Sequence, residues 1–544
     1  MCACFYYIFY KLISKHKGWI LILGISIFYF KGYEYAASLF FLFLVFTILN
    51  IKNNFKNYFE IVACAICGVV VFFVKANFGI VALPILAVNI GILIFSKNIR
   101  SLLVYFGVIL LVFCIIYAKV NIDLVHYVKY SLPMISCYNE AMQIAIDPEG
   151  TAFRSAVIYM MIFTGIVLFY FWQNNDRKYS FVKIYSVLLM ALMLFLTYKN
   201  GFTRADDHTQ GFFLMLPLFT IIALFLFDFA GSRKAKIVCI IVIFICDLNV
   251  DLPHGGEGKG FINKVTFFYS RNYFQTLFKK QEDRGAEELK IPDDKLKIVG
   301  NSTIDIFPID ISIMQLNNLN YDPRPVMQTY AAYNPLLDSL NANHFYKQSR
   351  PEFAMVKMGY VDNRYVAWDE PLTHAMLHLN YKYTDFISFN KDTGLVNTDA
   401  SFLLLRSTDE KGKYPEFEKL FERTVNFEDT VHFDFKDDTP IYMTVDIEAT
   451  AAGKIKEILY QAPLLHVSLF LNHECTSSLY YEAIRPIIKA PVLISNAICD
   501  NLDFREFMVG HSQQNAKIKA FAFHSDGWGY KQKIKLTFYK FSNY

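Results

Sequence analysis

The distribution of apolar residues divides the chain into two unlike halves near residue 250. A helix needs about 20 mostly apolar residues to cross the hydrocarbon core of a bilayer. Stretches that approach this length occur only in the first half, at residues 18–31, 34–51, 59–75, 79–96, 101–118, 155–172, 182–198, 211–230 and 236–250. The pattern predicts a polytopic α-helical membrane bundle over residues 1–252. It has eight or nine spans, depending on whether the short stretch 18–31 crosses the bilayer or lies at its interface.

Basic residues are concentrated in alternate connections between these stretches. The basic connections contain Lys52 and Lys56, Lys97 and Arg100, Arg177, Lys178 and Lys183, and Arg233, Lys234 and Lys236. Because cytoplasmic loops of membrane proteins are enriched in lysine and arginine, these connections are expected in the cytoplasm. The sequence therefore predicts a multi-pass protein of the bacterial inner membrane. Residues 119–154, residues 199–210 and everything after residue 250 would lie outside the cytoplasm.

The second half divides further by the period of its apolar residues. Residues 253–294 contain an amphipathic run, which predicts a linker helix at the membrane surface. From 295 to 415, short strand-like runs alternate with helical ones, which predicts an extracytoplasmic α/β domain. From 416 to 544, strand-like alternation dominates and predicts an antiparallel β-sandwich.

Composition is consistent with this division. Hydrophobic residues make up 54% of the chain and charged residues 19%, and the mean hydropathy is +0.29, as expected for a membrane half joined to a soluble half. The net charge is +4, and the basic residues of the first half are expected at the cytoplasmic membrane face. The charge therefore does not indicate a nucleic-acid partner. Cys64 and Cys67 form a C-x-x-C inside an apolar stretch, where packing is expected rather than redox chemistry. Cys475 and Cys499 lie in the exterior half and could either pair or remain reduced.

The most concentrated group of chemically useful residues lies in the short exterior loop 199–210. It contains Lys199, Arg204, Asp206, Asp207 and His208. Lysine and arginine can bind a phosphate, histidine can exchange a proton near neutral pH, and paired aspartates can hold a divalent cation or act as a general base. Together these residues suit a lipid-linked phosphate or pyrophosphate substrate. The structural alternative is a solvated turn in which the aspartates cap the next helix.

The long exterior loop 119–154 is a second candidate. Its acidic candidates are Asp123, Glu140, Asp147 and Glu149. A connection of this length between membrane spans usually has a purpose, such as a catalytic carboxylate that faces the membrane. The alternative is that the loop packs under the exterior domain.

A third candidate follows the first strand-like run of the α/β domain. Asp305 is followed by a rigid Pro-Arg-Pro around Arg324 and by Tyr330 and Tyr333. Arginine binds anions and aromatic faces stack on sugars, so these residues could bind substrate. The alternative is structural, with prolines that fix a loop and Arg324 in an internal ion pair. No P-loop, dinucleotide-binding glycine fingerprint, nucleophile elbow or zinc-ligand spacing is present in the sequence.

Two motifs carry a family resemblance. Phe202-x-Arg204-x-Asp206-x-His208, and Asp305-Ile306-Phe307-Pro308 followed by Pro323-Arg324-Pro325-Val326-x-Gln328-x-Tyr330-x-x-Tyr333, resemble a group of uncharacterised bacterial multi-span membrane proteins over residues 195–375. The overall layout is similar to GT-C membrane glycosyltransferases, which implies a polyprenyl-phosphate-linked sugar donor and an exterior-loop carboxylate. The chain departs from that class because its first exterior loop, around residues 31–34, is short and lacks the usual acidic motif. O-antigen ligases and polymerases also use exterior arginines and a histidine, which Arg204 and His208 resemble.

These observations predict an inner-membrane glycosyltransferase of envelope polysaccharide assembly, with a lipid-linked sugar donor and a glycan acceptor. Arg204 would bind the donor phosphate, Asp206 or Asp207 would act as base or metal ligand, and His208 would assist proton transfer. The cofactor is open, and a divalent cation is one possibility. The alternatives are an enzyme similar to O-antigen ligases or polymerases, and a non-enzymatic membrane scaffold whose exterior domain binds a glycan or a partner protein.

Overall fold

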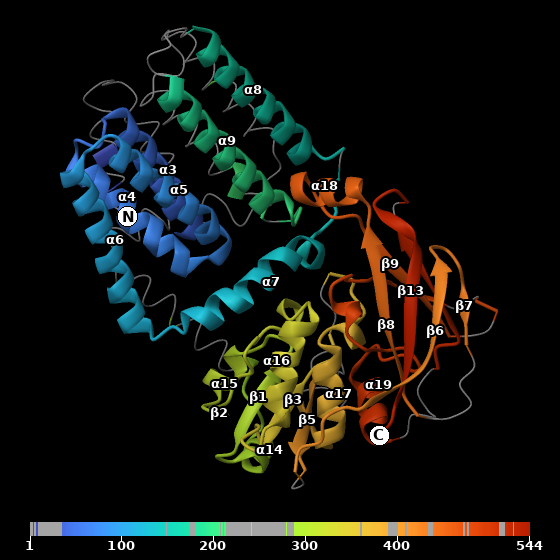
Figure 1. The fold of residues 1–544 in the computed structure, drawn as a ribbon. Helices are drawn as coiled ribbons and strands as arrows, with labels where there is room; N and C mark the ends of the chain where they lie inside the picture. The colour runs from blue at the N-terminus through green and yellow to red at the C-terminus, as the bar shows by residue number, and fades with distance from the viewer. Residues whose placement is uncertain are drawn as a thin grey trace. The chain divides into compact units, whose positions relative to one another are not determined.

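The computed structural model describes two compact units (Figure 1). The described residues are 4, 7–8, 35–147, 149–173, 180–206, 208–209, 211–213, 241, 279, 288–359, 362–389, 401–408, 411–433, 439–471, 474–475, 478–510, 517–525 and 527–543. The helical unit comprises residues 1–131 and 144–270, and the C-terminal unit comprises residues 132–143 and 271–544. The predicted domain boundary at residue 252 falls in a range outside the described residues.

The helical unit is built from the apolar stretches of the first half. Its helices are α3 (Tyr35–Lys52), α4 (Tyr58–Val74), α5 (Ala76–Phe95), α6 (Ile99–Val120), the start of α7 (Leu124–Met142), α8 (Thr151–Gln173) and α9 (Ser180–Phe202). Within the described residues, three helical segments are long and apolar enough to cross a membrane: Ala76–Phe95, Ile99–Val120 and Ile184–Phe202. Ala36–Lys52 and Tyr58–Val74 are shorter apolar helices. The predicted stretches 18–31, 211–230 and 236–250 lie outside the described residues except for 211–213 and 241.

Helices α3 to α6 contact one another through a small buried polar group as well as through apolar side chains. Asn89 donates to the hydroxyl of Tyr105 at 3.1 Å, and the Thr47 hydroxyl lies 3.3 Å from the Cys64 sulfur. Interhelical hydrogen bonds of this kind hold apolar helices in register. Cys64 and Cys67 are both buried among these helices, where their side chains contribute to packing.

Three connections of the helical unit meet at one end of its helices. The Lys75 ammonium, between α4 and α5, donates to Asn200 near the end of α9 at 3.2 Å. The hydroxyl of Tyr127, at the start of α7, donates to the backbone oxygen of Phe72 at 2.6 Å. The backbone amide of Ile144 donates to Thr203 at 3.1 Å. The connections predicted to be exterior therefore lie together.

The C-terminal unit begins with a five-stranded mixed sheet of order β2-β1-β3-β5-β4. The strands are β1 (Thr303–Phe307), β2 (Asn320–Tyr321), β3 (Phe353–Val356), β4 (Tyr381–Ser388) and β5 (Ser401–Ser407). β1 is parallel to β2 and β3, whereas β5 is antiparallel to β3 and β4. The helices are α14 (Asp293–Val299), α15 (Ser312–Leu316), α16 (Pro335–Tyr346) and α17 (Pro371–Asn380). This arrangement confirms the predicted α/β character of the region.

Helices cover both faces of this sheet, as the alternation of side chains along its strands requires. Ile304 and Ile306 of β1 share a core with Val299 of α14 and Ile313 of α15. On the opposite face, the buried residues of β1 and β3 pack with α16 and α17, and Asp305 belongs to this face because it lies between the two isoleucines. A buried aspartate in the core of a sheet needs partners, and Arg324, in the loop between β2 and α16, supplies them: its backbone N–H and its Nη1 both donate to Asp305 Oδ2 at 3.3 Å.

The rest of the C-terminal unit is β-rich, and its strands match the alternating runs of the sequence. They are β6 (Phe417–Asn426), β7 (Val431–His432), β8 (Ile441–Ala449), β9 (Leu465–Phe470), β10 (Ser478–Glu482), β11 (Val492–Leu493), β12 (Ala520–Ser525) and β13 (Tyr530–Phe541). They form two antiparallel four-stranded sheets, β10-β9-β12-β7 and β11-β8-β13-β6. Helices α18 (Ala451–Leu459) and α19 (Asn501–Met508) lie between strands in the sequence. The antiparallel β-rich region is as predicted.

The C-terminal unit also includes residues 132–143, the second part of α7. The Glu140 carboxylate forms a two-pronged ion pair with the guanidinium of Arg485, with Nε 2.7 Å from Oε2. The Tyr333 hydroxyl donates to the backbone oxygen of Met134 at 2.6 Å, and Arg364 donates to the backbone oxygen of Ala141. A segment far from residues 271–544 in sequence is thus part of their fold.

Candidate functional site

The charged exterior loop follows α9 and is folded back on that helix by aromatic packing. The rings of Phe202 and Phe212 are both buried, with centroids 5.3 Å apart. A Cβ added to Gly201 would lie 2.9 Å from the Cβ of Phe212, so glycine permits this close approach. The backbone of Ile144 pairs with the loop on its other side, because Ala205 donates to Ile144 at 3.4 Å.

This loop brings together three of the predicted site residues. Arg204 Nε donates to Asp206 Oδ2 at 3.1 Å, and Nη2 lies 3.1 Å from the same oxygen. The other carboxylate oxygen, Oδ1, lies 2.6 Å from His208 Nδ1 and accepts the His208 backbone N–H at 3.1 Å. The side chains are 14%, 33% and 51% exposed for Arg204, Asp206 and His208. Asp206 therefore joins a largely buried guanidinium to an accessible imidazole.

Two opposing effects set the pKa of Asp206. Partial burial raises the pKa of its carboxyl, whereas the hydrogen bonds from His208 and the charge of Arg204 lower it; the net pKa lies below the usual value. Asp206 is therefore a carboxylate at neutral pH. The backbone bond from His208 is the turn contact that the capping alternative predicts, but that alternative does not account for the contacts with the His208 ring and Arg204.

The remaining residues of the loop contribute less to this geometry. Lys199 lies in the last turn of α9. Asp207 lies outside the described residues. Within the described part of the chain, no three histidine, cysteine, aspartate or glutamate side chains are grouped so that they could hold a metal ion.

Each of the four acidic residues of the long loop has a local structural contact or an exposed position. Asp123 caps α7: its Oδ1 accepts the amides of Val125 and His126 at 3.0 and 3.1 Å. Asp147 accepts the amide of Glu149 at 2.9 Å in a turn, and both side chains are exposed. Glu140 is paired with Arg485. For Glu140 these contacts favour the packing alternative.

Arg324 lies inside the α/β region, where its side chain has no exposed surface. Nη1 donates to the backbone oxygen of Ile306 at 2.6 Å and to the Asp305 carboxylate at 3.3 Å. Nη2 donates to the Thr329 hydroxyl at 2.9 Å and to the backbone oxygen of Pro308 at 3.3 Å. Nε donates to the Glu370 carboxylate at 3.5 Å. Its guanidinium also lies 3.8 Å from the centroid of the Phe307 ring. All five N–H groups of an arginine are thereby used, which favours the structural alternative over substrate binding.

The two tyrosines of the third candidate have different environments. Tyr333 is buried, and its hydroxyl donates to Met134. Burial raises the pKa of Tyr333 above its ordinary value. Tyr330 is partly exposed and lines a pocket.

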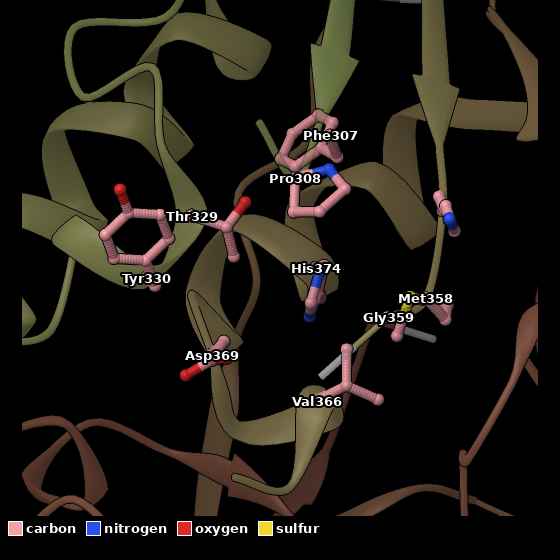
Figure 2. Close-up of a pocket in the computed structure, with 10 residues that line it drawn as sticks. Phe307, Pro308, Thr329, Tyr330, Met358, Gly359, Val366, Asp369 and His374 are labelled. Carbon is pink, nitrogen blue, oxygen red and sulfur yellow. The ribbon is translucent and has the colours of Figure 1, made fainter. Parts of the chain in front are cut away.

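That pocket lies at the carboxyl ends of β1 and β3 (Figure 2). Its lining residues are Phe307, Pro308, Thr329, Tyr330, Lys357, Met358, Gly359, Val366, Asp369 and His374. The chain passes from β1 to β2 on one side and later to β3 on the other, so the pocket marks the point where the strand order reverses. Ligands of open α/β sheets bind at such switch points.

Asp369, Glu370 and His374 of this region were not singled out from the sequence. Burial raises the pKa of Asp369 to about 6 and that of Glu370 to about 7, and lowers the pKa of His374 to about 4. Glu370 is fully buried in the left-handed region, with φ 49°. In the sequence, Asp369 and Glu370 form an acidic pair immediately before Pro371, at the start of a helix. The β1 residues that this pair approaches are about sixty positions away, so the sequence alone does not bring them together.

Comparisons with known proteins give no further guidance. No protein family model matches the chain, and no curated protein or solved structure is significantly similar to it. The resemblance to multi-span membrane proteins and to GT-C glycosyltransferases therefore remains a prediction from the motifs.

Proposed function

We propose that this protein is a bacterial inner-membrane glycosyltransferase that takes its sugar from a polyprenyl-phosphate-linked donor at the outer face, during assembly of an envelope polysaccharide. The observation that carries the proposal is the Arg204–Asp206–His208 group. It combines a phosphate-binding guanidinium, an orienting carboxylate and an accessible imidazole at the end of an apolar helix. A lipid-linked phosphate places its reacting bond at such a position, because its hydrocarbon chain stays in the bilayer.

The geometry favours His208 as the base and Asp206 as the residue that positions it. When Nδ1 donates to Asp206, Nε2 is the proton acceptor. As the acceptor hydroxyl oxygen bonds to the anomeric carbon of the donor, its proton passes to Nε2. The bond between that carbon and the phosphate oxygen breaks, and its electron pair leaves with the lipid phosphate. Arg204 stabilises the charge on that phosphate.

The membrane topology belongs to the same proposal. We place eight or nine spans in the inner membrane, with the Arg204 loop, residues 119–154 and the C-terminal unit outside the cytoplasm. The contacts among Lys75, Tyr127, Ile144 and the end of α9 support this, since they bring the sparsely basic connections to one end of the helical unit. Residues 132–143, which belong to the loop 119–154, are part of the C-terminal unit. This supports placing the loop 119–154 and residues 271–544 on the same side of the membrane.

A β-sandwich is the proposed arrangement of the two antiparallel sheets, in an exterior region that would hold the glycan acceptor. Buried residues of both sheets belong to one core, among them Val445 and Leu536 of one sheet and Val467 and Phe521 of the other. Two sheets that bury one face each against a shared core are typical of a sandwich.

The test compares His208→Gln and Asp206→Asn with wild type in cells whose own copy of the gene is deleted. Loss of a general base typically slows transfer by about a hundredfold or more, so surface polysaccharide should fall to near background in both variants. The matched control is His126→Gln, because His126 Nδ1 also lies 2.5 Å from an aspartate, Asp123, but has no arginine in the pair.

Full polysaccharide output from His208→Gln and Asp206→Asn proteins that insert normally would refute the proposed transfer mechanism. If deletion of residues 425–544 nevertheless abolished function, the scaffold alternative would be favoured. Membrane quantities of each variant should be measured by immunoblotting of washed membranes, so that a failure to insert is not mistaken for a failure of chemistry.

A further inference from the structure

The pocket between β1 and β3 has polar groups that the fold itself does not use. Asp369 is only 8% exposed, yet its carboxylate makes no hydrogen bond with any residue that the structure describes. The His374 ring is hydrogen-bonded to the backbone of Ala367, and its buried Nδ1 has no partner in the described residues. A buried acceptor without a partner, such as His374 Nδ1, is costly, and with the Asp369 carboxylate beside it at the same pocket it indicates that a ligand supplies the donors.

The cations near the pocket are already bonded within the fold. The charge of Arg364 acts on Asp369, but its guanidinium donates to the backbone oxygens of Ala141 and Tyr330. Arg324 lies behind Phe307 with its N–H groups already bonded. Lys357 contributes to the lining, but its ammonium lies 6.0 Å from the centroid of the Phe402 ring. Phe402 belongs to the core on the opposite face of the sheet. At neutral pH, Asp369 is a carboxylate and His374 is uncharged. The Asp369 carboxylate would repel a phosphate or carboxylate ligand there.

Aromatic and apolar groups complete the lining. Phe307, Tyr330 and Met358 contribute apolar surface next to the polar groups, and Figure 2 shows them on different sides of the pocket. The pocket encloses about 290 Å³ of empty space including its open mouth. Its inner part has room for about one water-sized group. A single hydroxyl therefore fits inside, and a larger ring would remain at the mouth beside Tyr330.

We propose that this pocket binds a neutral pyranose residue, with one sugar hydroxyl seated inside and donating to Asp369 or His374, and with the sugar ring against Tyr330. Hydroxyl groups supply the O–H donors that a carboxylate and a neutral imidazole nitrogen require. Aromatic side chains suit the C–H faces of sugar rings. The Thr329 hydroxyl, which accepts from Arg324, keeps its own O–H to donate to a sugar oxygen. This inference stands on the pocket and does not require the transfer reaction.

The experiment is saturation-transfer NMR on the full-length protein in nanodiscs. The probes are methyl glycosides of glucose, galactose and mannose, with inorganic phosphate and sodium glucuronate for comparison. We expect at least one neutral glycoside to receive saturation from the wild type. Asp369→Asn should weaken its binding about tenfold, because the sugar hydroxyl would then donate to a neutral amide oxygen instead of a charged carboxylate. Tyr330→Ala should weaken it as well.

The matched control is Asp294→Asn, which makes the same chemical change on an exposed residue of α14 and should leave binding unchanged. Tryptophan fluorescence, to which the buried Trp368 contributes, reports whether each variant is folded. His208→Gln should also bind normally, so transfer and sugar binding can fail independently. The inference is overturned if folded Asp369→Asn and Tyr330→Ala proteins bind as the wild type does, if no neutral glycoside binds, or if phosphate or glucuronate binds in its place.

Discussion

Arg204 and Arg324 both pair with an aspartate, but they have different access to solvent. The Arg204 side chain is 14% exposed and its aspartate also holds an exposed histidine, whereas Arg324 and both of its carboxylate partners are fully buried. An arginine whose N–H groups are all hydrogen-bonded inside the fold stabilises the fold but has no donor left to bind a substrate. At the scale of the residue, burial separates the candidate catalytic group from the structural one.

The buried group around Arg324 leads to a prediction for Glu370→Gln. One guanidinium faces two carboxylates, Asp305 and Glu370, and burial raises the pKa of Glu370 from 4.5 to about 7. The folded state therefore binds a proton between these pH values that the unfolded state releases. Stability from this group is complete below about pH 4.5 and falls as pH rises towards 7, by at most about 1.4 kcal/mol per pH unit.

Glu370→Gln should flatten this decline in unfolding free energy between pH 5 and pH 7, because glutamine cannot titrate. The measurement is unfolding followed by tryptophan fluorescence, to which the buried Trp368 contributes, at several pH values on the full-length protein in nanodiscs. Glu418→Gln, on an exposed strand position, serves as the control. Equal pH slopes for wild type and Glu370→Gln would contradict the assignment.

Helix α7 shows how one element can belong to two units. Its first part, to residue 131, belongs to the helical unit, and residues 132–143 belong to the C-terminal unit. Pro133 lies inside the helix near this division. The Glu140–Arg485 pair, with side chains 6% and 18% exposed, fixes the second part. Hydrogen bonds to Glu140 keep the pKa of Arg485 above its ordinary value despite burial.

At this scale we predict that Glu140→Ala destabilises the C-terminal unit by about 3–5 kcal/mol, because it leaves the Arg485 charge buried without its partner. Replacing both residues, as in Glu140→Met with Arg485→Met, should recover much of the loss. Glu149→Ala, an exposed change in the same loop, should have little effect. Limited proteolysis and denaturant unfolding would measure the differences. A Glu140→Ala protein as stable as wild type would show that the pair contributes nothing.

For the whole molecule, the central expectation concerns sidedness. We predict that alkaline phosphatase fused after Asn121 or Glu149 is active, because the enzyme needs the periplasm, and that a fusion after Asn98 is inactive. Asn98 lies in a connection flanked by Lys97 and Arg100, which the positive-inside rule places in the cytoplasm. Activities should be normalised to the amount of fusion protein. The reverse pattern of activity would invert the topology and remove the basis for an exterior reaction.

The sequence by itself predicted the apolar helices and the β-rich C-terminal region, in that order, because these follow from the local periodicity of apolar residues. It did not predict α7, which lies in the stretch 119–154 that reads as a loop. It also identified Arg204, Asp206 and His208, since those residues are close in the chain and a short loop keeps them close in space. Helices α8 and α9 lie where the long apolar stretches predicted helices. The antiparallel strands lie where the alternation of apolar residues predicted strands.

Only the tertiary structure decided which charged residues are buried and which distant segments meet. Glu140 and Arg485 are 345 positions apart, and Asp369 reaches the end of β1 only through the folding of the sheet and α17. Such contacts are non-local, so no window of sequence contains both partners. Desolvation is likewise a property of all the surrounding segments together. It fixes Arg324 as an internal ion-pair residue and leaves His374 Nδ1 as a buried acceptor without a partner in the described residues.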